Sequence, residues 1–139
     1  MRFMIIVKAT ADTEAGKFPE GEARQKMFAA MDVYHEQLAQ AGALLDASGL
    51  QPSSKGWRIR YNGSQRRVID GPFTEAKELI AGYTLIQVRS RAEALEWSKR
   101  FPNPVGEHLD AEIEVRQLYE LEDFAEPDEL PRFREIGMR

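Results

Sequence analysis

The sequence predicts an α+β fold of the split β-α-β type with an inserted β-hairpin. Two observations lead to this prediction. Strand-like and helix-like patterns follow one another in the order β-α-β-hairpin-β-α-β. Two of the strand patterns, residues 3–9 and 79–88, are apolar at both odd and even positions, which is typical of central strands that are covered on both faces.

Composition limits the class of protein. A chain of 139 residues is long enough for one hydrophobic core and too short for two. Its net charge of −4 argues against a general attraction to nucleic acid or to anionic membranes. The chain has no cysteine, which excludes disulfides, thiolate nucleophiles and cysteine metal sites. Its start lacks the features of a signal peptide and no segment has the length of a membrane span, so we expect a cytoplasmic protein.

In the first half of the chain, the strand at residues 3–9 is followed by a loop with two glycines and a proline, residues 10–21. The next segment, residues 22–42, is predicted to be helical because apolar residues recur every three or four positions: Met27, Met31, Tyr34, Leu38 and Ala41. Gly42 is a common type of helix end, and residues 43–50 are predicted to form the second strand.

The middle of the chain contains the predicted hairpin and a sharp turn. Trp57, Ile59 and Tyr61 alternate with arginines, and Asn62-Gly63 is a strong hairpin signal before the second arm at residues 66–69. Asp70-Gly71-Pro72-Phe73 then turns the backbone, and we expect a positive φ at Gly71. Such a turn would hold the Asp70 carboxylate at the mouth of the sheet.

The second half begins after the strand at residues 79–88. Ser90-Arg91-Ala92-Glu93 has the pattern of a capping box, and the helix that it opens is expected to run to Pro102. A last strand at residues 111–119 alternates apolar and charged residues, so one of its faces is expected to be wet. We therefore divide the chain into a domain at residues 1–121 and a C-terminal tail at residues 122–139, which is expected to fold only against a partner.

The predicted assembly follows from the same pattern. Two helices can cover only one face of the sheet, although both central strands are apolar on two faces. The other face is most simply buried by a second copy that packs sheet to sheet, so a homodimer is expected.

Several ordered motifs resemble one known family. They agree with the DGPF group of YCII-related proteins across about residues 1–121, and they lie at residues 70–73, 75–79, 82–83, 93–97 and 114–116. The resemblance implies a ferredoxin-like dimeric α+β barrel. It further implies an enzyme with a His–Asp pair in a small cleft, and genes near those of extracytoplasmic-function sigma factors, which makes a sigma factor a candidate partner.

His35 and Asp70 are the candidates for that catalytic pair. His35 flanks the apolar stripe of the first helix, from where an imidazole can reach the edge of the sheet. A carboxylate that holds one ring nitrogen leaves the other free to move a proton near neutral pH. The alternative is that His35 is a surface or cap residue and that Asp70 bonds its own turn.

Four further residues are candidates for ligand binding: Lys8, Ser54, Lys77 and Arg116. The three cations would ring a cleft that holds an anionic or phenolic small molecule, and Ser54 would contribute a hydroxyl. The alternatives are solvated turn residues for Lys77 and Ser54, and an ion pair of Arg116 with Glu112 or Glu114, which contributes only ~0–1 kcal/mol.

The sequence thus favours a cofactor-free acid–base enzyme, of the isomerase or lyase type, that acts on a small polar or aromatic molecule. The alternative is a regulatory module that binds a small ligand or a sigma factor without chemistry. We expect no cofactor, because no glycine-rich phosphate loop is present, and no metal, because the two histidines lack ligand spacing. Arg58, Arg60, Arg66 and Arg67 are expected to be solvated or to form a subunit contact, and no nucleic-acid partner is expected.

Overall fold

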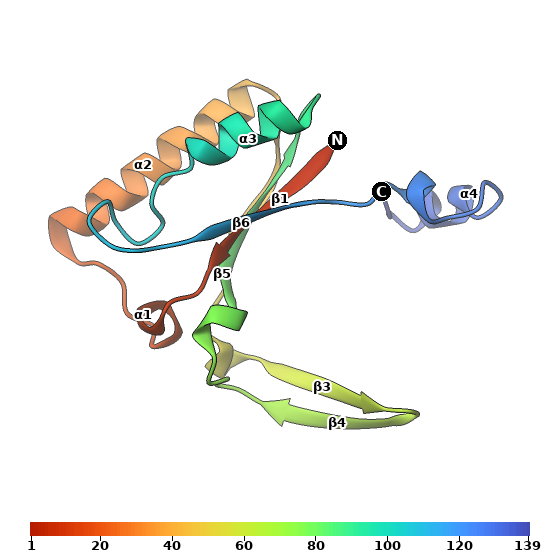
Figure 1. The fold of residues 1–139 in the computed structure, drawn as a ribbon, viewed down its shortest axis with the longest axis horizontal. Coiled ribbons are helices and arrows are strands. Elements are labelled where there is room, and N and C mark those ends of the chain that lie inside the picture. The colour runs from red at the N-terminus through yellow and green to blue at the C-terminus, as the bar shows by residue number, and fades with distance from the viewer.

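The computed structural model describes residues 1–139 and is built around a four-stranded antiparallel sheet with strand order β2-β5-β1-β6 (Figure 1). The strands are β1 (Arg2–Lys8), β2 (Leu44–Gly49), β5 (Ile80–Gln87) and β6 (Ile113–Gln117). This order confirms the predicted split β-α-β arrangement, and the fold is ferredoxin-like. The two strands that are apolar on both faces, β1 and β5, lie at the centre as expected.

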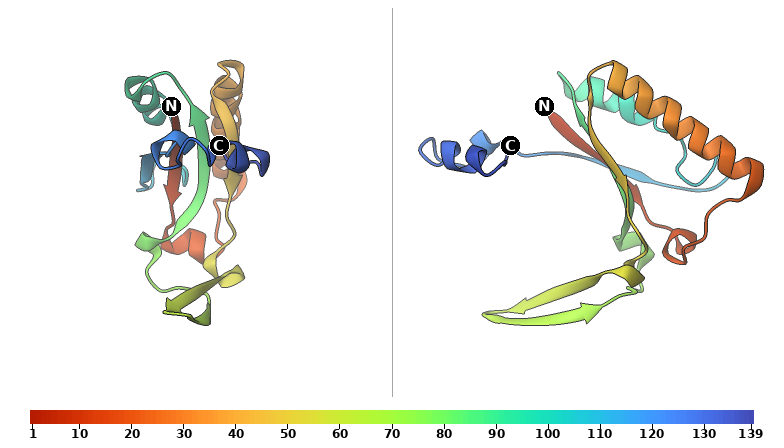
Figure 2. Two further views of the ribbon diagram at one scale, coloured as in Figure 1. Left: turned by 90° about the vertical axis from the view of Figure 1, so that its right-hand side faces the viewer. Right: turned by 180° about the vertical axis from the view of Figure 1, so that it is seen from behind.

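Two helices, α2 (Gly21–Gln40) and α3 (Arg91–Lys99), cover one face of this sheet (Figure 2). Alternation along β1 buries Phe3 and Ile5 beneath the helices, and it directs Met4 and Ile6 to the opposite face. We call that opposite face, which carries no helix, the open face. α3 begins at the Ser90 cap as predicted, but it ends at Lys99 and does not reach Pro102.

The two helices are joined by a buried tyrosine. The hydroxyl of Tyr34 on α2 donates a hydrogen bond to the carbonyl oxygen of Trp97 on α3 at 2.8 Å. Burial raises the pKa of Tyr34 to about 12, although the nearby charge of Arg100 acts in the other direction. The hydrogen bond that joins the two helices therefore depends on the protonated form of the Tyr34 hydroxyl, which burial favours.

The predicted hairpin is a separate two-stranded sheet of β3 (Trp57–Asn62) and β4 (Gln65–Asp70) that projects away from the body (Figure 1). Asn62 pairs with Gln65, so the two-residue turn is Gly63-Ser64. The turn thus lies one position later than Asn62-Gly63 suggested, because Gly63 with φ of 60° takes the first of its two places.

Short helical segments fill the connections. α1 (Ala11–Glu14) lies inside the predicted first loop and is capped by Thr10. The others are the 3-10 turns η1 (Ser53–Lys55), η2 (Ala76–Glu78) and η3 (Leu121–Asp123), and the helix α4 (Leu130–Glu135).

The chain leaves the sheet after β6 as an extended segment that projects from the body on the same side as the hairpin (Figures 1 and 2). We call residues 119–139 the C-terminal arm. Its base is held by Arg2, whose guanidinium donates to the carbonyl oxygen of Tyr119 and to the carboxylate of Glu120, both at 3.1 Å. The molecule thus carries two projections that flank its open face.

None of its helices has both the length and the apolar character needed to cross a membrane.

Candidate functional site

His35 lies on the sheet-facing side of α2, where both of its ring nitrogens are engaged. Nδ1 is 2.7 Å from the carbonyl oxygen of Met31, and Nε2 is 2.8 Å from the hydroxyl oxygen of Thr84 on β5. Because a carbonyl oxygen only accepts, Nδ1 carries the hydrogen and Nε2 faces the Thr84 hydroxyl. Thr84 is only 2% exposed. The imidazole therefore connects α2 to the centre of the sheet.

Asp70 lies elsewhere, at the exposed end of β4, where it pairs with Trp57 across the hairpin. Neither nitrogen of His35 contacts it, so the expected His35–Asp70 contact is not formed within one chain. The physical reason is that the hairpin pairs only with itself. In addition, the chain that follows the turn enters β5 at Ile80. Thr84, the partner of His35, lies four residues further along that strand, which corresponds to about 13 Å.

The Asp-Gly-Pro-Phe turn packs against the turn η1. The amide of Gly71 donates to the carbonyl oxygen of Gly56 at 3.0 Å, and the amide of Phe73 donates to the hydroxyl oxygen of Ser53 at 2.9 Å. The positive φ expected at Gly71 is wrong, since Gly71 is not among the glycines with positive φ. A Cβ at this position would instead lie 1.9 Å from the Ser53 carbonyl oxygen, so glycine is required by close backbone contact.

Ser53 is also bonded to a residue that sequence reasoning missed. The Ser53 amide donates to the Glu14 carboxylate at 3.1 Å, and the Ser53 hydroxyl donates to the same carboxylate in a very short hydrogen bond. A single hydroxyl thus links α1, η1 and the Asp-Gly-Pro-Phe turn. The available signal was the Thr10-x-x-Thr13 pattern, whose reciprocal hydrogen bonds begin α1 and place Glu14 in this helix.

A cavity of about 520 Å³ opens beside this network. Glu14 and Ser54 share its wall with Lys55, and a smaller cavity of about 100 Å³ extends it toward Ile80 at the start of β5. We call the meeting point of residues 13–18, 49–56, 70–73 and 79–81 the turn junction. It is a site of mixed character at one end of the sheet, with the Glu14 carboxylate in its wall.

The other candidate residues divide between the turn junction and the rest of the molecule. Lys8 pairs with Ile80 in the β1–β5 ladder, and Lys77 lies in η2 directly before β5, so both come from segments that adjoin the junction. Arg116 does not, because it lies opposite Met4 near the other end of β1. Its guanidinium is 3.3 Å from the Glu114 carboxylate, which is the ion pair considered above.

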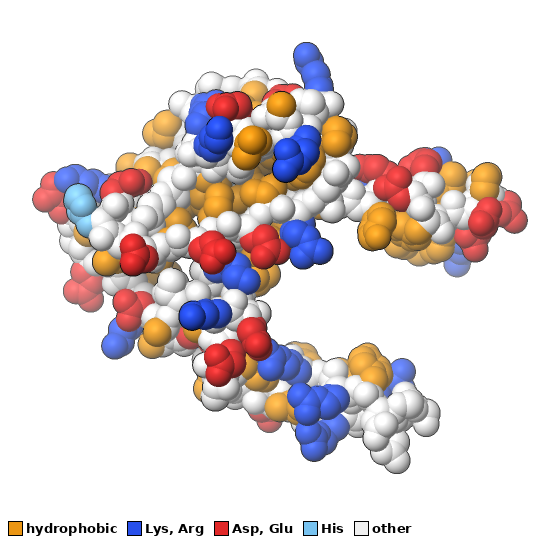
Figure 3. All heavy atoms as spheres, in the orientation of Figure 1, with side chains coloured by type: hydrophobic (Ala, Val, Ile, Leu, Met, Phe, Trp, Pro, Cys, Tyr) orange, Lys and Arg blue, Asp and Glu red, His pale blue; other side chains and the backbone are white.

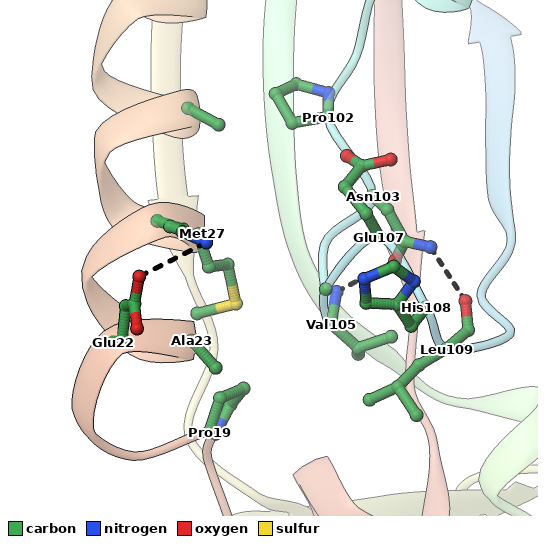
Figure 4. Close-up of a pocket in the computed structure, with 13 residues that line it drawn as sticks. Pro19, Glu22, Ala23, Met27, Pro102, Asn103, Val105, Glu107, His108 and Leu109 are labelled. Atoms are coloured by element: carbon green, nitrogen blue, oxygen red, sulfur yellow. Dashed lines mark hydrogen bonds and ion pairs between the residues drawn. The ribbon is translucent and has the colours of Figure 1, made fainter.

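A second cavity, of about 550 Å³, is a groove between α2 and the loop at residues 102–109 (Figure 4). Ala23 and Met27 on the helix face Val105 and Leu109 on the loop across it. Its charged lining includes Lys26, which is 3.3 Å from the Glu22 carboxylate. The groove is therefore mainly apolar, whereas the wall of the turn junction is of mixed character.

These features define the class of protein: a small ferredoxin-like α+β protein with a cavity at one end of its sheet that has a carboxylate in its wall. The sequence pattern of the YCII-related domain matches residues 1–126, and the chain belongs to the YCII-related family. An uncharacterised protein of Rhizobium meliloti (strain 1021) is 27% identical over 110 residues, which cover 79% of this chain and 84% of that relative.

One solved structure with a similar arrangement is 5-chloro-2-hydroxyhydroquinone dehydrochlorinase from Burkholderia phenoliruptrix AC1100 in complex with 2,5-dihydroxybenzoquinone. The match has a TM-score of 0.42 and 13% identity, and it covers 86% of this chain and 95% of that chain. Similarity at this level says nothing about the chemistry of the present protein.

Proposed function

We propose that this YCII-related protein is a cofactor-free acid–base enzyme, of the isomerase or lyase type, that acts on a small polar or aromatic molecule at the turn junction. The observation that carries the proposal is the Glu14 carboxylate, fixed by the hydroxyl and amide of Ser53 in the wall of an open cavity. A cavity of about 520 Å³ lies within the size range of small-molecule sites.

The proposed chemistry is a proton transfer at Glu14. Both carboxylate oxygens are oriented by Ser53, and each retains a lone pair for a substrate. Glu14 takes a proton from one substrate atom and returns it to another in an isomerisation, or to the departing group in an elimination. Lys55 in the cavity wall would balance an anionic group on the substrate. Lys8 and Lys77, on segments that adjoin the junction, are the further candidates for this role. Asp70, at the exposed end of β4, supplies a second carboxylate at the edge of the junction.

An acid–base role for His35 is the competing assignment within the same proposal. Its hydrogen bond to the Met31 carbonyl oxygen fixes the tautomer, and a fixed tautomer is what a histidine base requires. This assignment places the chemistry beneath α2, whereas the first places it at the turn junction. The two can be separated by substitution.

The experiment is a thermal-shift screen of small hydroxylated aromatic compounds and small polar carboxylic acids. We compare the wild type with Glu14→Gln, His35→Gln and Met27→Trp, the last of which fills the α2 groove. A compound bound at the turn junction raises the melting temperature of the wild type and of the other two variants, but not that of Glu14→Gln. Loss of the shift in His35→Gln alone would instead indicate a site beneath α2. Loss of the shift in Met27→Trp alone would indicate a site in the groove.

Compounds that bind are then followed by NMR for turnover. Conversion by the wild type and its loss in Glu14→Gln support the enzyme. Binding without conversion of any compound supports the alternative, a module that binds a ligand for regulation.

We also propose that the protein is a homodimer joined through its open face. The support is the apolar character of that face at the centre of the sheet, where Met4 pairs with Leu85 and Ile6 pairs with Tyr83. Burial of two such faces against each other should remove on the order of 2,000 Å² or more from water. Light scattering at micromolar concentration measures the mass directly, and a stable monomer would overturn the proposal.

A further inference from the structure

The β3–β4 hairpin has two largely exposed faces, although the Phe73 ring lies 3.8 Å from the Arg58 guanidinium on one of them. On one face, Ile59 pairs with Val68, and both are exposed, with Trp57 and Tyr61 on either side of Ile59. A two-stranded hairpin is at best marginally stable alone in water, so an exposed apolar face on one indicates a missing partner.

The other face of the hairpin is basic, and two of its cations lie next to each other. Arg60 lies directly opposite Arg67 in the β3–β4 register, and like charges in that relation repel. The ion pairs of the chain include neither the arginines of this face, Arg58, Arg60 and Arg67, nor Arg66, which lies opposite Tyr61 on the apolar face. The hairpin therefore presents cations without an anionic partner.

The C-terminal arm presents the opposite charge. Residues 120–129 contain six carboxylates and no cation. Within this stretch, Glu120 pairs with Arg2 and Glu122 pairs with Arg134, which leaves four carboxylates outside any ion pair: Asp123, Glu126, Asp128 and Glu129. The arm also exposes Tyr119 and Phe124, whose rings contact each other.

The basic face of the hairpin and the acidic arm do not meet within one molecule. Hairpin and arm project to the same side but are separated by a wide hollow in front of the open face (Figure 3). In a dimer with two-fold symmetry, the hairpin of one subunit can contact the C-terminal arm of the other. The same contact then forms a second time between the remaining hairpin and arm.

We infer that the hairpin of one subunit clasps the acidic stretch 120–129 of the other. The apolar hairpin face packs on the partner subunit, and the Arg60–Arg67 pair is neutralised by carboxylates of the partner's arm. This inference rests on the proposed homodimer and goes beyond it, because a sheet-to-sheet dimer does not by itself require either projection.

The absence of cysteine from the chain allows a direct test. Gln65→Cys, on the basic face of the hairpin beside the Arg60–Arg67 pair, and Phe124→Cys, on the arm, both replace exposed side chains. The two variants are mixed, allowed to exchange subunits, and treated with a short bis-maleimide. The clasp predicts a cross-linked dimer in the mixture and little in either variant alone. A cross-link in Gln65→Cys alone, or none in a mixture that light scattering shows to be dimeric, overturns the clasp but not the homodimer. A monomeric protein overturns both.

A charge exchange provides the second measurement. The double variant Arg60→Glu/Arg67→Glu should weaken dimerisation by about tenfold or more in sedimentation equilibrium. Adding Glu126→Lys and Asp128→Lys to the same chain should restore much of the loss, because both clasps of the dimer then pair opposite charges again. No restoration, with the circular dichroism spectrum of every variant unchanged, contradicts the clasp.

Discussion

Gly71 lies where two stretches of backbone touch. The expectation of a positive φ gave the correct residue for the wrong reason, because the constraint is the Ser53 carbonyl oxygen and not the torsion angle. A side chain at position 71 would push η1 away from the turn, and with it the hydroxyl that orients Glu14.

We therefore predict that Gly71→Ala lowers the free energy of unfolding by about 1–3 kcal/mol, the usual effect of overpacking against backbone. Chemical denaturation measures the change. Gly49→Ala is the matched control, because a Cβ there meets nothing within 4 Å and φ is not positive. Equal stability of the two variants would show that the contact between Gly71 and Ser53 does not constrain the turn.

Tyr34 gives the molecule a defined response to high pH. Its pKa is about 12 in the folded chain and 10.0 as the reference value for an unfolded chain. Between these values the unfolded chain releases a proton that the folded chain keeps, so the free energy of unfolding falls as pH rises. Below pH 10 this contribution is constant.

The predicted loss from Tyr34 is up to about 2–3 kcal/mol by pH 12, from the size of the pKa shift. Urea denaturation at several pH values gives the free energy of unfolding of the wild type and of Tyr34→Phe. The contribution of Tyr34 is the difference between the two proteins in how steeply this free energy falls with pH. Tyr34→Phe should be less stable at neutral pH, since it loses the hydrogen bond to Trp97, but it should lose less stability above pH 10. An equal fall of the free energy of unfolding with pH in both proteins would contradict the raised pKa of Tyr34.

At the scale of the element, His35 and Thr84 connect α2 to β5. Thr84→Val keeps the shape of the side chain but leaves Nε2 of His35 without its partner in a mostly buried place. We expect the free energy of unfolding to fall by about 1–3 kcal/mol. The double variant His35→Leu/Thr84→Val should recover part of this loss, because both polar groups are then absent. A double variant that is destabilised by the sum of the two single changes would argue against the hydrogen bond.

The elements also show what the sequence could predict. Apolar periodicity located α2, both central strands and the hairpin, because each buries or aligns one recurring set of side chains. Ser90 predicted the start of α3 because its hydroxyl accepts from the amide of Glu93. The reciprocal bond of the expected capping box differs, since the Glu93 carboxylate accepts from the amide of Arg89.

The site was less predictable than the fold, because it depends on contacts between distant segments. Glu14 and Ser53 are 39 positions apart and are joined only when α1 and η1 meet. No local pattern reveals such a contact. His35 was found as a polar residue beside an apolar stripe, but its partner Thr84 lies within a strand that periodicity treats as plain core.

At the scale of the whole molecule, the sheet has one face that its own chain covers and one that it does not. Leu85 lies in the centre of the open face, next to Met4, while its neighbours Thr84 and Ile86 are buried beneath the helices. A single residue can therefore test the assembly without entering the core of the subunit.

We predict that Leu85→Glu converts the proposed dimer into a folded monomer. A carboxylate at this position would be buried against its own copy across the two-fold axis, and two unpaired like charges in an apolar interface are strongly unfavourable. Light scattering should give half the mass of the wild type, with an unchanged circular dichroism spectrum. Leu95→Glu is the matched control, since Leu95 is 46% exposed on α3, on the helical side of the sheet. Dissociation by Leu95→Glu, with Leu85→Glu still dimeric, would place the interface on the helices and would remove the open face from the proposal.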